Sequence, residues 1–251
     1  MEAKRFSLFE MSWPEVQQNL DKIKVAIIPA GSCEQHGPNG TFEVDTARAY
    51  EFSKRLAETT YPTSLVVPPV LFGVSPHHMK FPGTISLKPE TFISVCVDVI
   101  DSLYSHGLRK FFMINGHGGN QAPLKVVMSI VRQKYPDSKI AMASPTAAAQ
   151  DVAAHRIESK IIGHACEGEM SQCMYLAPWA VKKDSLAKGE LLLSPEEYKN
   201  PWGVEVGRLW HEVTANGALG DATKASYELG KELMDTALFR LTQFVEQFVT
   251  E

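Results

Sequence analysis

The sequence has no long hydrophobic run and no excess of basic residues. Its longest apolar stretches, such as Val25–Pro29 and Phe111–Ile114, are far shorter than the roughly 20 residues that span a bilayer. The first residues lack the apolar segment of a signal peptide, so we expect a soluble cytoplasmic protein with no membrane partner. With 25 basic and 29 acidic residues the net charge is −4, so nucleic acid is not an expected partner.

Cysteine is scarce, and its spacing is wrong for a structural zinc site. The four cysteines, Cys33, Cys96, Cys166 and Cys173, form no Cys-x-x-Cys pair, which argues against a disulfide scaffold and fits a reducing compartment. Cys96 lies in an apolar helical stretch and is expected in the core. Cys33 and Cys166 stand near histidines, but neither has a sequence context that favours a reactive thiolate.

Several common catalytic motifs are also missing. The chain has no Gly-x-Ser-x-Gly elbow, so it lacks the nucleophile turn of an α/β-hydrolase. It has neither a Gly-x-x-x-x-Gly-Lys-Ser/Thr loop nor a Gly-x-Gly-x-x-Gly loop, which excludes the usual nucleotide cradles, and it has no His-Glu-x-x-His.

What is present is an alternation of short apolar runs and longer helical patterns over 251 residues, which we interpret as a single α/β domain spanning residues 1–251. Strands are predicted over 25–29, 64–67, 110–114 and 140–143, which implies a mostly parallel sheet covered on both faces. Helices are predicted over 45–59, 89–106, 122–135 and 227–249, with another beginning near Glu169. Asp45 and Thr46 are placed to cap the first of these helices. The stretch 182–216, with Trp202 and Trp210, is predicted to be a loop-rich excursion or a subunit contact.

Histidines and glycines gather where the predicted strands end. Gly31–Gly37 follows the first strand and carries His36, Gly73–Thr84 follows the second and carries His77 and His78, and Asn115–Asn120 follows the third and carries His117. Loops that leave the carboxyl ends of parallel strands open on the same edge of the sheet. We therefore expect these three loops to converge, although they are about 80 residues apart in sequence.

Four side chains in these loops or at the start of the following helix have the chemistry of metal ligands. Glu34 and His36 are two residues apart in an extended segment and so point to a common side. Asp45 lies near the positive end of a helix dipole and stays ionised. Together with His117 they form a set of carboxylates and imidazoles that suits zinc, manganese or iron better than calcium. The sequence predicts a metal site at this edge, although Glu34 alone could be a solvated loop carboxylate.

A second group of titratable residues opens a later helix. His164, Glu167 and Glu169 lie within six residues of one another. Glu169 could simply complement the helix dipole. Alternatively it is a metal ligand or a catalytic base, and His164 is the proton donor to a leaving group.

Five ordered motifs, from about Ile28 to Gly230, resemble those of the creatininase (creatinine amidohydrolase) family. They are Glu34-Gln35-His36-Gly37-Pro38 with Asp45-Thr46, Phe81-Pro82-Gly83-Thr84, Asn115-Gly116-His117-Gly118-Gly119-Asn120, His164-Ala165 with Glu169 and Ser171, and Gly217-Ala218-Leu219-Gly220-Asp221 with Ala222-Thr223.

The resemblance implies a three-layer α/β/α sandwich that hydrolyses a C–N amide-type bond of a small-molecule amide, such as a cyclic one. It implies two divalent metal ions per chain, of zinc, manganese or iron. Carried over residue by residue, Glu34, Asp45 and His117 hold one ion and His36 and Asp45 hold the other, with Asp45 bridging. His164 stands where the family keeps a histidine for proton transfer. A homohexamer or another homo-oligomer is also implied.

The chain departs from the creatinine-hydrolysing members at two points. Gly119 stands where they carry a metal-binding glutamate, so Glu169, with Glu167 behind it, is expected to complete the second metal site, and the pocket is expected to be wider. No tryptophan lies between His117 and His164, where those enzymes enclose their substrate. The prediction is a creatininase-like hydrolase that turns over creatinine weakly. The alternatives are a relative acting on a formamidopyrimidine or a peptide-like amide, and a non-catalytic metal-binding protein.

Overall fold

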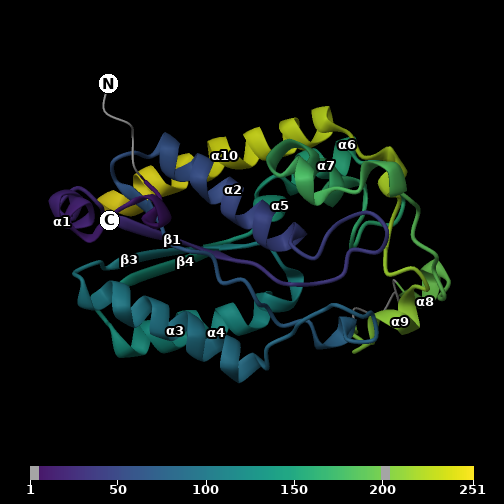
Figure 1. Cartoon of the computed structure of the whole chain (residues 1–251), viewed down its shortest axis with the longest axis horizontal. Coiled ribbons are helices and arrows are strands. Elements are labelled where there is room, and N and C mark those ends of the chain that lie inside the picture. The colour runs from purple at the N-terminus through teal and green to yellow at the C-terminus, as the bar shows by residue number, and fades with distance from the viewer. Residues whose placement is uncertain (1–5, 199–203) are drawn as a thin grey trace.

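A parallel four-stranded sheet, in the order β2-β1-β3-β4, forms the centre of the molecule (Figure 1). The computed structural model describes residues 6–198 and 204–251. The strands are β1 (Val25–Ala30), β2 (Ser64–Val66), β3 (Lys110–Asn115) and β4 (Lys139–Ala143). Each lies within one residue, at either end, of a strand predicted from the sequence. The central pair runs in register from Ala26 opposite Phe111 to Ala30 opposite Asn115.

Helices cover both faces of this sheet, as the three-layer prediction requires (Figure 1). One layer consists of α3 (Pro89–Ser105) and α4 (Gln121–Lys134). The other consists of α2 (Val44–Thr59), α7 (Glu167–Leu176) and α10 (Tyr227–Thr250). The helices predicted over 89–106, 122–135 and 227–249 are therefore confirmed, and the helix expected near Glu169 begins at Glu167.

The alternation of side chains along the strands explains why two layers of helices are needed. Successive residues of a strand point to opposite faces of the sheet. In β1, Val25 and Ile27 pack with the apolar residues of α2, α7 and α10. Ala26 and Ile28 pack with those of α3 and α4, together with the buried Cys96. Because all of β1 is buried, both faces must be covered to keep its apolar surface from water.

Shorter helices connect these layers. They are α1 (Trp13–Asn19), α5 (Pro145–Ala148), α6 (Gln150–Arg156), α8 (Pro195–Tyr198) and α9 (Trp210–Val213), with 3₁₀ turns at Leu8–Glu10, Pro76–His78, Gly118–Asn120, Pro178–Ala180, Lys183–Ser185 and Ala222–Lys224. In the described part of the stretch 182–216 the helices are all this short, as the loop-rich prediction requires; Trp202 lies outside the described residues. Among residues 6–198 and 204–251, the helices are too short or too polar to cross a membrane.

The expected cap of α2 is wrong in detail. The helix begins at Val44, and the residue before it is Glu43, whose side chain makes no capping bond. Asp45 lies inside the first turn, and Thr46 Oγ1 donates to the Ser32 carbonyl at 3.2 Å. Asp45 and Thr46 therefore serve the loop after β1 instead of the end of their own helix.

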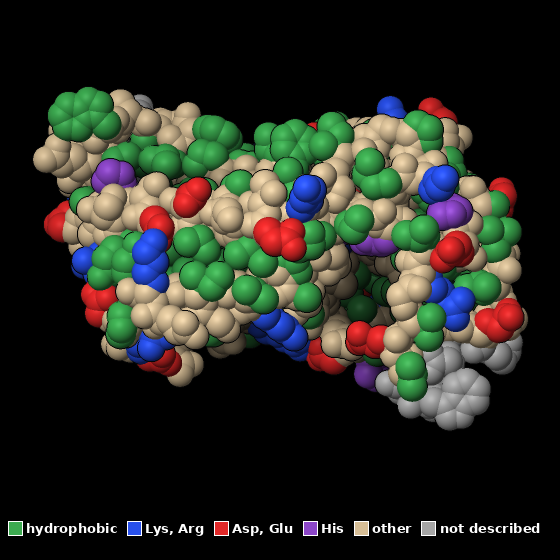
Figure 2. All heavy atoms as spheres, turned by 90° about the horizontal axis from the view of Figure 1, so that it is seen from below, with side chains coloured by type: hydrophobic (Ala, Val, Ile, Leu, Met, Phe, Trp, Pro, Cys, Tyr) green, Lys and Arg blue, Asp and Glu red, His purple; other side chains and the backbone are tan. Residues whose placement is uncertain are grey.

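The face of the molecule below the α3–α4 layer mixes apolar and charged side chains (Figure 2). Acidic and basic groups are interspersed over it, as expected for a chain with a net charge of −4. A hollow opens in this face, and histidine side chains are visible near its rim.

Candidate metal centre

Three loops that leave the carboxyl ends of strands meet at one edge of the sheet. Glu34 and His36 follow β1, His78 follows β2 and His117 follows β3. His78 Nε2 lies 3.4 Å from Glu34 Oε1, and His117 Nε2 lies 3.3 Å from Glu34 Oε2. The strand order reverses between β1 and β3, where parallel sheets form ligand crevices. The predicted convergence of the three histidine-bearing loops is confirmed.

His36 is buried with one ring nitrogen left free. Its Nδ1 donates to the backbone carbonyl of Glu34 at 3.0 Å, which places the ring proton on that nitrogen. Its Nε2 is buried without a hydrogen-bond partner and faces Asp45 Oδ1 at 3.5 Å and Glu169 Oε2 at 3.7 Å. The free nitrogen of His36 is therefore directed at two carboxylates.

His117 approaches the same carboxylate from the other loop. Its Nε2 donates to the Val74 carbonyl at 3.1 Å and also lies 3.1 Å from Ser75 Oγ. Its Nδ1 is then free and faces Asp45 Oδ2 at 3.1 Å. Asp45 thus presents one oxygen to His36 and the other to His117. Gly116 permits this approach, because a Cβ there would lie 2.2 Å from the Asp45 carbonyl oxygen.

Arg48, one turn along α2 from Asp45, ties the acidic groups together. Its Nη2 lies 2.8 Å from Glu169 Oε1 and 3.4 Å from Asp45 Oδ1, and it donates to the Gly116 carbonyl at 2.5 Å. The other oxygen of Glu169 accepts the backbone N–H of Ala165 at 2.7 Å. Both oxygens of Glu169 are therefore held in place before any ligand binds.

These groups fit a divalent cation. Two ligand atoms that each lie 2.0–2.2 Å from a tetrahedral zinc ion are about 3.4 Å apart. The distances from His36 Nε2 and His117 Nδ1 to the facing carboxylate oxygens run from 3.1 to 3.7 Å. Buried atoms Glu34 Oε2, His36 Nε2 and Asp45 Oδ2 have no hydrogen-bond partner, which is costly unless another group satisfies them. A metal ion between them removes that cost.

The pKa values of the histidines and carboxylates in the cluster show that it favours positive charge. Burial alone would lower the pKa of each ligand histidine, but the facing carboxylates outweigh burial and raise the pKa of His36 and of His117 to about 9. Burial raises the pKa of Glu34 to about 7, against the opposing effect of His117. For Asp45, burial is outweighed by the two histidines, and the pKa lies well below its usual value. Without a metal, a second proton on each ring, at His36 Nε2 and His117 Nδ1, supplies the positive charge that a metal ion would bring.

His164 lies against His36, with ring centroids 4.3 Å apart. Its Nε2 donates to the Gln35 carbonyl at 2.6 Å, which leaves Nδ1 to face Glu34 Oε1 at 3.4 Å. Burial, with the nearby His36, lowers the pKa of His164 to about 3. His164 is thus a neutral imidazole whose Nδ1, free of a hydrogen, points into the cluster.

Of the two acidic residues that open α7, only Glu169 faces the histidines. Glu167 accepts the backbone N–H groups of Glu158 at 3.0 Å and Ser159 at 2.8 Å, together with the Ser159 hydroxyl at 2.5 Å. Its carboxylate therefore braces the loop before α7. Glu169 Oε2 lies 3.7 Å from His36 Nε2, so it is the one of these two residues that faces the candidate metal ligands.

The extra room expected at Gly119 is absent. A Cβ at this position would lie 2.1 Å from the Val74 carbonyl oxygen and 2.5 Å from His117 Nε2, so the backbone and the histidine already fill the space. The pocket is nevertheless large, about 660 Å³, and Gly119 is not among its lining residues. Its width comes instead from small side chains on α5 and α6, Ala147, Ala153 and Ala154 among them.

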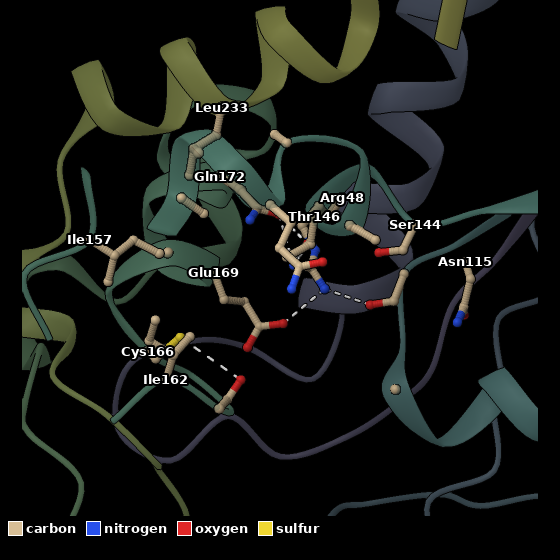
Figure 3. A pocket seen from close by; sticks show the side chains of 18 of the residues that line it. Arg48, Asn115, Ser144, Thr146, Ile157, Ile162, Cys166, Glu169, Gln172 and Leu233 are labelled. Carbon is tan, nitrogen blue, oxygen red and sulfur yellow. Dashed lines mark hydrogen bonds and ion pairs between the residues drawn. The ribbon is translucent and has the colours of Figure 1, made fainter. Parts of the chain in front are cut away.

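Figure 3 shows this pocket between α2, α7 and the segment after β4. Glu169 points from α7 towards Arg48, and Thr146 and Gln172 lie beside them. The wall that Ile157 and Ile162 contribute is apolar. The pocket therefore has a polar end, next to the candidate metal ligands, and an apolar side.

Two residues of the site, Arg48 and Trp210, were not predicted from the sequence. Arg48 could have been found, because a spacing of three residues from Asp45 places both on one helix face. Trp210 gave no local signal, since it reaches the site from the loop-rich stretch. Its ring stacks on His78 at 4.7 Å between centroids and meets His164 edge-on at 5.4 Å, so the histidine cluster does have a tryptophan cover.

Comparison with known proteins shows which family the chain belongs to. The creatininase family model, described as creatinine amidohydrolase, matches residues 9–245. A 3-dehydro-scyllo-inosose hydrolase of Thermotoga maritima is 31% identical, covering 95% of this chain and 82% of the relative. A mycofactocin precursor peptide peptidase of Mycobacterium ulcerans is 28% identical, covering 93% and 86%.

Solved structures agree with the sequence match. A Bacteroides fragilis structure assigned as a creatinine amidohydrolase superposes with a TM-score of 0.86 at 25% identity, over 99% of this chain and 98% of the other. Creatininase structures described as a Zn–Zn type and as a Mn form share the fold, with TM-scores of 0.79 and 0.75. The chain belongs to the creatininase family, a family of metal-dependent hydrolases.

Proposed function

We propose that this chain is a dinuclear metal hydrolase that cleaves a C–N amide-type bond. The observation that supports this most strongly is the placement of Asp45 between two free imidazole nitrogens, His36 Nε2 and His117 Nδ1. In this proposal Asp45 would be a ligand shared by two ions of zinc, manganese or iron. Glu34 and His117 complete one site, and His36 and Glu169 complete the other.

The residues of the chain have distinct tasks in such a reaction. An amide carbon is a weak electrophile and water a weak nucleophile, and two bound divalent ions supply an acidified water and a polarised carbonyl. His164 takes a proton at Nδ1 and returns it to the leaving nitrogen, because its Nε2 is engaged by the Gln35 carbonyl. Glu169 acts as a ligand and not as the base, since Arg48 and Ala165 already hold its two oxygens.

The size of the pocket favours a substrate larger than creatinine. A volume of about 660 Å³ lies in the range of sites that bind drug-sized ligands, and a small planar ring would leave most of it unfilled. The apolar wall at Ile157 and Ile162 suits an uncharged group attached to the scissile amide. We therefore favour a formamidopyrimidine or a peptide-like amide over creatinine itself.

A second candidate substrate is a hydroxyl-rich ring ketone. The pocket is also lined by uncharged polar side chains, among them Asn115, Gln121, Ser144 and Gln150, which suit hydrogen bonds to hydroxyl groups. The relative from Thermotoga maritima is named for such a compound, an inosose. This candidate shares the metal centre and differs only in the bond that is hydrolysed.

Elemental analysis and a substrate panel test the proposal. After reconstitution with zinc, manganese or iron(II), the purified chain should hold close to two ions. The loaded protein should hydrolyse at least one member of a panel of formamides, cyclic amides, short peptides and inososes. A chain that takes up no metal is not this hydrolase. Creatinine turnover with kcat/KM above roughly 10⁴ M⁻¹s⁻¹ would contradict the proposed substrate size.

A further inference from the structure

The histidine cluster contains a further set of atoms that could hold a cation. Glu34, His78 and His164 each offer a ligand atom, and these atoms lie within 4.8 Å of one another. Glu34 Oε1 lies 3.4 Å both from His78 Nε2 and from His164 Nδ1. By distance alone, a third ion could bind beside the two proposed above.

The side-chain amide of Gln35 determines whether a third ion can bind at this position. Its Oε1 accepts the backbone N–H of Gly37 at 2.7 Å, which identifies the other terminal atom as the NH₂ group. That nitrogen donates to the Gly217 carbonyl at 3.0 Å and lies 2.7 Å from His78 Nδ1. Gln35 is buried, and both of its amide hydrogens have an acceptor in this arrangement.

The direction of the second bond fixes where His78 carries its proton. Because Gln35 donates to Nδ1, this nitrogen is the acceptor of a neutral ring and Nε2 carries the hydrogen. His78 Nε2 is the atom that faces Glu34. Stacking of the ring on Trp210, with planes 27° apart, holds it in this orientation. A ring nitrogen that carries a hydrogen cannot bind a metal ion.

We propose that Gln35 is a positioning residue that closes the third cation position. Its amide makes His78 a donor towards Glu34, so His78 orients that ligand and does not compete with it for metal. The centre is thereby restricted to two ions. The number of bound ions rests on the proposed function, whereas the position of the ring proton of His78 does not. The two predictions can therefore fail separately.

The state of His78 can be read directly in the full chain by nitrogen NMR of labelled histidine, first without metal and then with zinc. We expect the proton of His78 on Nε2 in both samples. Gln35→Met, which keeps the shape of the side chain and removes the donor, should shift the proton population towards Nδ1. Gln243→Met, an exposed glutamine on α10, should leave the His78 signals unchanged. A proton on Nδ1 in the unmodified chain, or identical signals in Gln35→Met, would overturn the proposal.

Zinc stoichiometry provides a second readout that does not depend on activity. The unmodified chain should bind two zinc ions. The Gln35→Met variant should bind a third ion more weakly, and the double variant Gln35→Met with His78→Phe should again bind only two. A third zinc ion bound to the unmodified chain would contradict the proposed role of Gln35. A folded Gln35→Met protein that binds only two zinc ions would contradict it as well. If Gln35→Met does not fold, the NMR measurement on the unmodified chain still decides the question.

Discussion

Asp45→Asn removes one negative charge from a side chain that faces two ligand histidines. Asp45 Oδ1 lies 3.5 Å from His36 Nε2, and Oδ2 lies 3.1 Å from His117 Nδ1. An asparagine of nearly the same size would present an NH₂ group to one of these nitrogens, so both ions lose a charged ligand. The fold should persist, because the two apolar clusters lie on the faces of the sheet and not at its edge.

The expected magnitude follows from metal linkage. Loss of a partner that only supports a metal ligand already costs 10- to 100-fold in affinity, so loss of a direct ligand should cost at least about 100-fold per ion. At a metal concentration of 100 Kd, each ion stabilises the fold by about 2.7 kcal/mol, and 100-fold weaker binding leaves about 0.4 kcal/mol. In a chain of this size 1 kcal/mol shifts Tm by 2–4 °C, so the metal-induced rise should shrink by roughly 5–9 °C per ion.

Thermal unfolding with and without zinc, beside elemental analysis, measures this effect. Asp137→Asn is the matched control, since Asp137 is an exposed partner of Arg109 far from the site. The control should keep the full metal-induced rise in Tm. An Asp45→Asn protein that retains both ions and the full rise would refute the bridging assignment.

Three further changes test other parts of the site. Arg48→Met should destabilise the metal-free fold by about 1.5–3 kcal/mol, because the partly buried Glu169 loses its nearest cation and its charged hydrogen bond, and keeps only His36 at 3.7 Å. Urea unfolding measures this, and a loss below about 0.5 kcal/mol would show that the pair is not needed. Gly119→Ala should lower the zinc content, because the new Cβ would displace the Val74 carbonyl or the His117 ring. A variant with unchanged zinc content and unchanged Tm would contradict this packing. In the metal-free fold the pKa of each ligand histidine is about 9, above the ordinary 6.5, so their stabilisation is complete below pH 6.5 and is lost as the pH rises through 9. The Tm in chelator should therefore fall between pH 6.5 and 9, whereas saturating zinc should suppress the fall; a flat metal-free profile would show that the histidines are not held as cations.

The parts of the site that follow from strand order could be predicted from the sequence. Each buried strand is a continuous apolar run that ends in glycine, and parallel strands bring their carboxyl ends to one edge. His36 and His117, about 80 residues apart in sequence, could therefore be predicted to lie together. The position of Asp45 between them was implied only by the resemblance to the creatininase family, since its own sequence context predicted a helix cap, whereas the side chain faces the histidines.

The remaining features depend on packing that no local pattern reveals. Trp210 reaches His78 across more than 130 residues from a stretch without regular periodicity. Gly119 indicated an open slot only because the course of the Val74 backbone could not be known. The width of the pocket arises from alanines on α5 and α6, two short helices that the sequence did not predict. The homo-oligomer that the resemblance implies stays a prediction, which light scattering of the purified chain can test.

Anomalous diffraction from crystals grown with zinc tests the central claim most directly, because it locates ions without reference to any substrate. We predict two peaks that share Asp45, one beside Glu34 and His117 and the other beside His36 and Glu169. Zinc absent from this cluster, or a single ion that does not contact Asp45, would contradict the dinuclear centre.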